Sequence, residues 1–184
     1  MSIAAVVLAA GASRRLGKPK QSLMVDGEML VERAVRVATE SGLLPVLVVM
    51  RADAEFRDAL VSAGVRCVVN EDAEEGMAAS IRCGVAAAKD EEAEGVVILP
   101  CDQPWLDADH LRELIEKPDS VASSAYGNVR GVPAYFPAAE FAMLMQLRGD
   151  VGARELLRSS RVVVNEKLAF DVDTPEDAAR LAAQ

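Results

Sequence analysis

Short uninterrupted runs of apolar residues alternate along the chain with segments whose apolar residues recur every three or four positions. The runs predict strands at residues 3–8, 45–50, 66–69, 96–99, 121–124 and 162–164. The periodic segments predict helices at residues 30–41, 54–63, 78–88 and 106–116. Because the strand runs do not alternate with polar residues, they are typical of strands buried on both faces. A mixed region at residues 127–137 interrupts this order and predicts an added antiparallel strand.

This order predicts an α/β fold in three layers, α/β/α, with a mostly parallel central sheet. We expect residues 1–184 to form a single domain, since the sequence shows no internal repeat, low-complexity segment or linker. The run at residues 3–10 has no basic segment before it, so we interpret it as a buried strand and not as a signal peptide. In such a sheet ligands bind beyond the carboxyl ends of the strands, and the loops that follow the strands are where chemistry is expected.

The composition excludes some classes of partner. The net charge is −9, and aromatic residues make up only 4% of the chain. An acidic protein with few aromatic side chains fits neither nucleic acid nor an anionic membrane as its main partner. The acidic stretches at residues 71–75 and 90–94 are interpreted as solvated loops.

Cysteine and histidine are scarce and show no metal-binding spacing. Cys67, Cys83 and Cys101 include no CxxC pair, so we expect free, mostly buried thiols in a reducing, cytoplasmic environment. The single histidine, His110, falls in a helical pattern, and we expect it at the surface.

The loop after the first strand concentrates positive charge in an acidic chain. Four of the seven residues from Arg14 to Lys20 are basic, and Gly11, Ser13 and Gly17 lie among or beside them. Glycines let backbone N–H groups approach an anion, and arginine and lysine add charged donors. Five residues separate the two glycines and a proline follows Lys18, so neither the P-loop nor the GxGxxG pattern fits. The loop predicts an anion site, with a solvated basic turn as the alternative.

A carboxylate follows the apolar run at residues 96–99. Asp102 lies in the sequence PCDQP, directly after that run. Mg²⁺ in proteins takes one or two carboxylates, with phosphate oxygens and waters as its remaining ligands. Asp102 is therefore a candidate metal ligand. Its alternative role is to cap a turn before Pro104 or the helix that begins near Asp107.

A second acidic segment lies near the C-terminus, in the sequence FDVDTPED. Asp171 and Asp173 stand two residues apart, so in an extended segment they face the same side. Thr174 with Asp177 has the spacing of a variant capping box, which explains those two residues but not Asp173. Because loops at one sheet edge come together, we expect Asp102 and Asp173 to lie close to each other and to Lys20.

Small residues recur on one predicted helix. Gly76, Ser80 and Gly84 are four residues apart and share a face, which suits either a ligand contact or close helix packing.

Taken together, these segments resemble the signatures of nucleotidyltransferases with a GT-A-like, Rossmann-type fold, also called nucleotide-diphospho-sugar-transferase-like. Residues 8–20 are similar to LAAGxSxRMGxxK, with Leu16 in place of methionine. Residues 76–84 resemble GMxxSLxxG, residues 130–133 RGxP, residues 149–154 GDxGAR and residues 171–177 DIDTPED. The similarity is greatest to the molybdenum cofactor nucleotidyltransferases, and among these to the cytidylyltransferase branch. The matches keep the family's order from residue 8 to residue 177.

The resemblance implies roles for individual residues. The catalytic set is Arg15, Lys20 and Asp102. The nucleotide-binding set is Leu8, Ala9, Ala10, Gly11, Ser13, Arg15, Lys20 and Ser80, with the serine at the nucleobase. The metal ligands are Asp102 and Asp173, with Asp171 positioning the latter. The acceptor-binding set is Arg130, Gly131, Pro133 and Arg154.

One residue of these segments departs from the family pattern, and two have other interpretations. Val132 stands where the family often has a more polar residue, which weakens the assignment of the acceptor. Arg154 is equally compatible with a surface salt bridge, and Asp150 is suited to be a helix N-cap.

The resemblance implies a cytoplasmic, Mg²⁺-dependent enzyme that transfers CMP from CTP to molybdopterin and releases pyrophosphate. Ala10 favours CTP, because the guanylyltransferase branch typically has glycine at that position. The alternatives are GTP as donor, another small phosphorylated acceptor, or a non-catalytic nucleotide-binding chaperone that delivers the cofactor. The implied partners are a nucleoside triphosphate, a molybdopterin-type acceptor, and a client molybdoenzyme or its chaperone.

Overall fold

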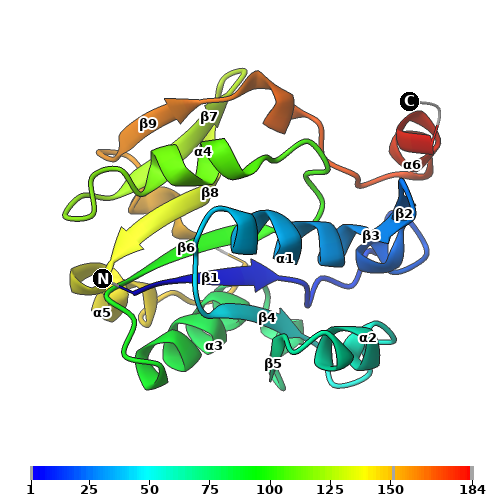
Figure 1. The fold of residues 1–184 in the computed structure, drawn as a ribbon, viewed down its shortest axis with the longest axis horizontal. Coiled ribbons are helices and arrows are strands. Elements are labelled where there is room, and N and C mark those ends of the chain that lie inside the picture. The colour runs from blue at the N-terminus through cyan, green and yellow to red at the C-terminus, as the bar shows by residue number, and fades with distance from the viewer. Residues whose placement is uncertain (1, 151, 183–184) are drawn as a thin grey trace.

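The computed structural model describes residues 2–150 and 152–182. Its centre is a seven-stranded sheet with the strand order β5-β4-β1-β6-β8-β7-β9 (Figure 1). The strands of this sheet are β1 (Ile3–Leu8), β4 (Val46–Met50), β5 (Arg66–Val69), β6 (Gly95–Pro100), β7 (Ala122–Tyr126), β8 (Val129–Pro137) and β9 (Arg161–Val164). Strand β8 pairs antiparallel with both β6 and β7, and the other pairings of this sheet are parallel. The predicted mostly parallel sheet, with one antiparallel strand within residues 127–137, is confirmed.

Helices cover both faces of the sheet. They are α1 (Leu30–Glu40), α2 (Arg57–Ser62), α3 (Met77–Asp90), α4 (Ala108–Leu114), α5 (Phe141–Leu144) and α6 (Pro175–Ala182). Alternate residues of β1 face opposite layers: Ala5 and Val7 pack with α1, α2 and α4, whereas Ala4 and Val6 pack with α3 and α5. Two apolar faces on one strand explain why its sequence does not alternate with polar residues.

A small hairpin and α6 form a third apolar cluster beside the sheet. The hairpin strands β2 (Met24–Val25) and β3 (Glu28–Met29) pair antiparallel. Val25 and Leu30 pack there against Val172 and Leu181, and Figure 1 shows the cluster beyond the carboxyl end of β1. This packing brings the segment after Lys20 next to the segment that carries Asp173. The hairpin was not predicted, because strands of two residues are too short to show a period.

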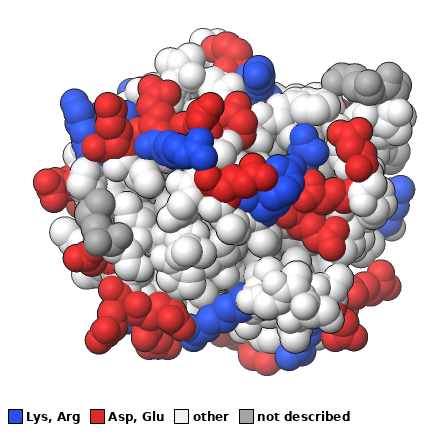
Figure 2. Space-filling view, viewed as in Figure 1, with Lys and Arg blue, Asp and Glu red and all other residues white. Residues whose placement is uncertain are grey.

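Element boundaries differ from the predictions by a few residues. The helix expected at residues 54–63 begins only at Arg57, and a short turn precedes it. None of the helices that the structure describes combines the length and the apolar character needed to cross a membrane. On the face shown in Figure 2, the described basic side chains lie beside acidic ones and form no broad basic surface.

The prediction of a surface position for His110 is wrong. Its side chain is only 4% exposed, because α4 packs its inner face on the sheet, and its Nε2 lies 2.7 Å from Ser124 Oγ. Burial lowers the pKa of this imidazole, and the nearby Asp107 and Glu113 oppose that shift only partly. The apolar period placed His110 on a helix. The pattern of residues 107–111 does not show which face of that helix packs on the sheet.

The cysteines and Gly84 behave as packing residues. All three cysteines are free; Cys101 is buried in the core, and Cys67 and Cys83 are half-buried against it. A Cβ atom at Gly84 would lie 2.2 Å from Val6 Cγ1, so this glycine lets α3 approach β1 closely. Of the two interpretations of the small-residue face, helix packing holds at Gly84.

Candidate active site

A cavity of about 560 Å³ opens at the carboxyl ends of β1 and β6. Most of the residues that the sequence assigned to nucleotide and metal binding line it: Leu8, Ala10, Gly11, Ser13, Arg15, Lys20, Ser80, Asp102 and Asp173. Ala9 lines a neighbouring cavity of about 390 Å³ that shares part of its wall with the first. The topology therefore gathers residues from four separate segments at one edge of the sheet, as the rule for parallel sheets requires.

The basic loop folds around a buried glutamine. The Gln21 amide donates to the carbonyl oxygens of Ala9 (3.0 Å) and Gly11 (2.8 Å). Ser13 Oγ accepts a hydrogen bond of 3.0 Å from the backbone N–H of Lys20, which closes the loop. Ser13 has φ 48°, a left-handed conformation that is uncommon for a serine and turns the chain at this point. Gln21 was missed in the sequence because a single buried amide has no motif of its own.

Lys20 lies between two carboxylates. Its Nζ is 2.5 Å from Asp102 Oδ2 and 2.9 Å from Asp173 Oδ1, and Arg15 also pairs with Asp173. The side chains of Lys20, Asp102 and Asp173 are 16%, 14% and 26% exposed. The predicted proximity of the two acids to each other and to the lysine is confirmed. It arises because Asp102 lies just beyond the end of β6, where the backbone N–H of Val172 donates to the Asp102 carbonyl (3.0 Å) and aligns the two acidic segments.

A third acid joins the cluster. Oxygens of Asp102, Asp171 and Asp173 all lie within 4.8 Å of one another. Burial, and then the negative charges of Asp102 and Asp173, raise the pKa of Asp171. Burial would lower the pKa of Lys20, but the charges and hydrogen bonds of Asp102 and Asp173 outweigh it and raise that pKa. Three carboxylate oxygens at this spacing are the hard ligands that a divalent cation such as Mg²⁺ or Mn²⁺ prefers.

Local capping holds the second acidic segment in place. Thr174 Oγ1 accepts from the backbone N–H of Asp177 (3.2 Å), and the Asp177 carboxylate accepts from the backbone N–H of Thr174 (3.0 Å). This reciprocal pair confirms the predicted capping box at the start of α6. Asp173 stands just before the cap, free to face the cavity.

Ser80 is held in one orientation on α3. Its hydroxyl oxygen accepts a hydrogen bond of 3.0 Å from the Asn70 amide, whose own oxygen accepts from the backbone N–H of Asp72 (3.0 Å). With its oxygen engaged in this way, the Ser80 hydroxyl has its proton left to donate into the cavity. Asn70 was missed in the sequence, since nothing distinguishes it from a turn residue.

Asp150 has a different capping role from the local one expected. Its carboxylate accepts from the backbone N–H of Met77 (3.4 Å) and so caps α3, which is distant in sequence. Gly76, with φ 119°, allows this approach, because a Cβ atom there would lie 2.8 Å from the Gly149 carbonyl oxygen. The capping chemistry was predictable, but only the tertiary contact decides which helix receives it.

The acidic stretch at residues 71–75 is solvated, as expected, but also paired. Glu74 bridges Arg51 (2.7 Å) and Arg14 (3.2 Å), and it lines the cavity. The bidentate contact of Arg82, followed by the backbone N–H of Gly149, lowers the pKa of Glu75 to about 2. These ion pairs join the loops after β1, β4 and β5.

The residues assigned to the acceptor lie apart from the cavity wall. Among the described residues that line the main cavity are Val132 and Asp150, but not Arg130, Gly131, Pro133 or Arg154. The Arg130 guanidinium instead donates to the carbonyl oxygens of Leu157 (3.1 Å) and Arg158 (2.6 Å). In this segment the side chain that reaches the cavity is the apolar Val132.

Comparison with known proteins places the chain among nucleotidyltransferases. A family model described as the MobA-like NTP transferase domain matches residues 5–164. The purine catabolism protein PucB of Bacillus subtilis is 36% identical over 94% of this chain and 92% of its own length. Nicotine blue oxidoreductase of Paenarthrobacter nicotinovorans is 33% identical over 97% and 96% of the two chains. A probable molybdenum cofactor guanylyltransferase of Opitutus terrae is 28% identical over 96% and 86%.

Solved structures share the fold over the whole chain. A nucleotidyl transferase from Methanothermobacter thermautotroptrophicus has a TM-score of 0.84 at 26% identity and covers 98% of this chain and 95% of its own. Rv0371c of Mycobacterium tuberculosis, in complex with manganese, has a TM-score of 0.76 at 28% identity and covers 100% of each chain.

Proposed function

The chain belongs to the family of the MobA-like NTP transferase domain, and from this membership and the geometry of the cavity we propose a specific reaction. The protein is a nucleotidyltransferase; in our proposal it transfers CMP from CTP to a molybdopterin-type acceptor and releases pyrophosphate, with Mg²⁺ as cofactor. The observation that carries the proposal is the cluster of Lys20, Asp102 and Asp173 beside the basic loop, inside one cavity.

Two of the four cations of the loop, Arg15 and Lys20, bind the triphosphate. Lys20 and Arg15 pair with Asp173 in the free protein, and the Arg15 side chain is 73% exposed, so it can turn toward phosphate oxygens. Gly11 and Ser13 line the same part of the cavity and leave room for the nucleotide to lie against the backbone. A guanidinium fork and a lysine charge at this point stabilise the charge that develops on the leaving pyrophosphate.

Asp102, Asp173 and Asp171 would hold the metal. When bound, Mg²⁺ would neutralise part of the negative charge of the triphosphate and so favour attack on it. The acceptor phosphate attacks the α-phosphorus in line, a new P–O bond forms and the bond to pyrophosphate breaks. A phosphate monoester is already ionised, so the reaction needs no general base from the protein.

Ala10 supports CTP as the donor. It is buried and lines the cavity, so its methyl group fills space that a glycine would leave open to the larger guanine ring. We expect Ala10→Gly to lower the KM for GTP relative to that for CTP, while Ala12→Gly, two residues further along the same cavity wall, leaves the ratio unchanged. Tighter GTP binding and faster GTP turnover in the wild type would reverse the choice of nucleotide.

The choice of acceptor is supported by the relatives named as molybdenum cofactor guanylyltransferases. A client molybdoenzyme or its chaperone is the expected recipient of the product. The test is a pyrophosphate-release screen of CTP, GTP, ATP and UTP, each with Mg²⁺ and molybdenum-loaded molybdopterin. We expect release with CTP. Tight nucleotide binding without release would instead favour a cofactor-delivery chaperone, and release only with another phosphorylated acceptor would overturn the choice of molybdopterin.

A further inference from the structure

Val132 and Pro133 form a bulge in β8 that neither neighbouring strand pairs. The β6–β8 ladder ends at the pair Ile98 and Ala134. On the other side, Ser123 pairs with Ala134 but Ser124 already pairs with Gly131, so the register shifts past two residues of β8. A bulge beside an active site redirects a side chain, and here the redirected side chain is Val132, which lines the cavity.

Side chains take the place of the missing ladder bonds. The Val132 carbonyl accepts from the Tyr126 hydroxyl (3.2 Å) and from the Gln103 amide (3.5 Å). The Pro133 carbonyl accepts from the Ser124 hydroxyl (2.6 Å). Since the Ser124 proton is used in this bond, its oxygen accepts from His110 Nε2 at 2.7 Å, which assigns the proton to that ring nitrogen.

The strand order places this bulge on one side of the cavity. In the order β1-β6-β8, β1 leads into the basic loop, β6 ends two residues before Asp102, and β8 lies beyond β6. Asp102 therefore follows the strand that lies between the one leading into the basic loop and the one carrying Val132. An acceptor that approaches from the side opposite the triphosphate would meet Val132.

We propose that Ser124, Tyr126, His110 and Gln103 are positioning residues that hold this bulge and so direct Val132 against the phosphorylated acceptor. The proposal rests on the proposed function. These side chains act through the backbone at residues 132 and 133 and do not touch substrate. Their loss weakens acceptor binding and leaves the nucleotide site intact.

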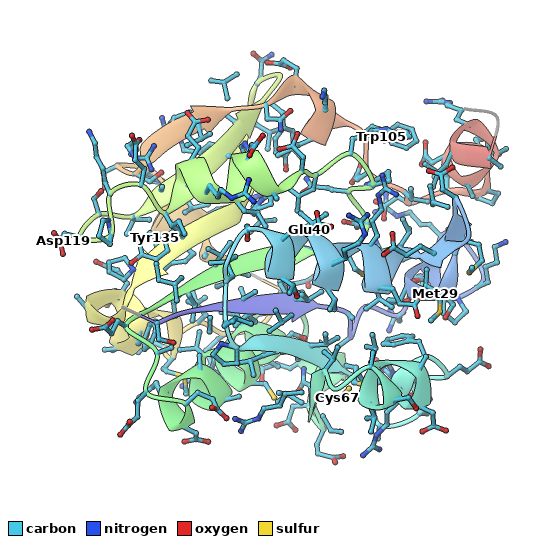
Figure 3. All side chains as sticks on the ribbon, in the orientation of Figure 1. Met29, Glu40, Cys67, Trp105, Asp119 and Tyr135 are labelled. Atoms are coloured by element: carbon cyan, nitrogen blue, oxygen red, sulfur yellow. The ribbon has the colours of Figure 1, made fainter. Side chains whose placement is uncertain are left out.

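Two matched pairs of variants test this role. Ser124→Ala is compared with Ser123→Ala, since Ser123 is equally buried but bonds to Ser160 Oγ (2.7 Å) and not to the bulge. Tyr126→Phe is compared with Tyr135→Phe, because the Tyr135 hydroxyl donates to the Pro118 carbonyl (2.7 Å). Figure 3 shows Tyr135 at the end of the molecule away from Trp105, which closely follows Asp102 in the chain.

Pyrophosphate release is measured with CTP saturating and molybdenum-loaded molybdopterin varied. We expect Ser124→Ala and Tyr126→Phe to raise the acceptor KM by about tenfold, a loss typical of slight misplacement, with kcat and the Kd for CTP unchanged. Hydrogen–deuterium exchange should rise in residues 129–136 for Ser124→Ala and not for Ser123→Ala. Thermal melts of all four variants distinguish local loosening of residues 129–136 from a general loss of stability.

Equilibrium dialysis of molybdopterin gives a readout that needs no turnover. A wild type that neither binds molybdopterin nor releases pyrophosphate would overturn the proposed function and this inference with it. If the wild type is active but both variants of each pair raise the acceptor KM equally, the positioning role alone is overturned. Faster exchange in residues 129–136 with an unchanged acceptor KM would do the same.

Discussion

Replacing Lys20 by methionine removes the cation that separates the acidic side chains of the cavity. Methionine keeps an unbranched, flexible apolar side chain in place of the lysine stem but has no charge. Oxygens of Asp102, Asp171 and Asp173 within 4.8 Å of one another then face each other with only the exposed Arg15, which pairs with Asp173, as a counter-charge unless a metal is bound. We expect a protein that folds but whose stability depends on divalent cations and on pH.

The magnitude follows from the spacing of the charges. At an effective dielectric constant of about 20, two unit charges about 4.8 Å apart repel by about 3.5 kcal/mol. At pH 8 an unperturbed aspartic acid would need about 5.6 kcal/mol to take up a proton, so the repulsion remains; at pH 5 protonation costs only about 1.5 kcal/mol and relieves it. The variant should therefore lose about 3 kcal/mol at pH 8 and about half of that at pH 5.

In the wild type, Lys20 should contribute no such change in stability between pH 5 and pH 8. The pKa of Lys20 is raised in the folded protein, so its contribution to stability is complete below the pKa of an unfolded lysine. That contribution is lost only as the pH rises through the raised value, well above this range.

Thermal unfolding in EDTA and in Mg²⁺ measures the effect. For a chain of this size about 3 kcal/mol corresponds to a Tm lower by about 6–12 °C at pH 8 without metal. Mg²⁺ at about 100 times its Kd restores about 2.7 kcal/mol of stability to the variant. The resulting rise in Tm should exceed that of the wild type, where the lysine competes with the metal. Turnover should fall by about 100- to 1000-fold, as for loss of one charged donor.

Lys18→Met is the matched control, because Lys18 is an exposed lysine of the same loop. It should leave the metal-free Tm unchanged. The account of the acidic cluster is refuted if Lys20→Met has the wild-type Tm in EDTA at pH 8, or if Mg²⁺ raises both proteins equally.

Three further outcomes are expected. Asp173→Asn keeps the shape of the side chain but removes one of the negative charges proposed to hold the metal. The variant should therefore fold normally and need far more Mg²⁺ for half-maximal turnover. Full activity after chelation of all divalent metal would contradict the mechanism. Gly84→Ala should cost up to about 2 kcal/mol net in urea unfolding, because its Cβ would lie 2.2 Å from Val6 Cγ1 and the overpacking of about 1–3 kcal/mol outweighs the roughly 1 kcal/mol gained in helix propensity; an unchanged unfolding midpoint would show that α3 can shift. Because burial lowers the pKa of His110 below its unfolded value, stability should fall as the pH drops from about 6.5 through that lowered pKa. His110→Asn should flatten this part of the curve of unfolding free energy against pH, and an identical slope would exclude His110 as its source.

The sequence by itself determined the strands, their mostly parallel arrangement and the edge of the sheet at which the cavity opens. It could do so because strands buried on both faces leave long apolar runs, and because parallel strands deliver their following loops to one edge. The basic loop with Lys20 and the acids Asp102 and Asp173 were found in the same way, from residue types that bind phosphate and metal, together with the family resemblance.

Only the tertiary structure decided which groups meet across the chain. Asp171 joins the acidic cluster, Gln21 supports the basic loop, and Asn70 orients Ser80, yet each is a single residue without a local pattern. Contacts between distant segments depend on how helices pack on the sheet, and short-range periodicity does not contain that information.

His110 shows the same division most clearly. Its helical setting was readable from the sequence, but the depth of α4 against the sheet made it a buried donor to Ser124. The bulge adds two residues to β8, and their carbonyl groups accept no hydrogen bond from β6 or β7. Buried side chains must donate to these carbonyl groups instead. That need arises only once three strands and a helix are assembled, and for this reason the sequence could not show it.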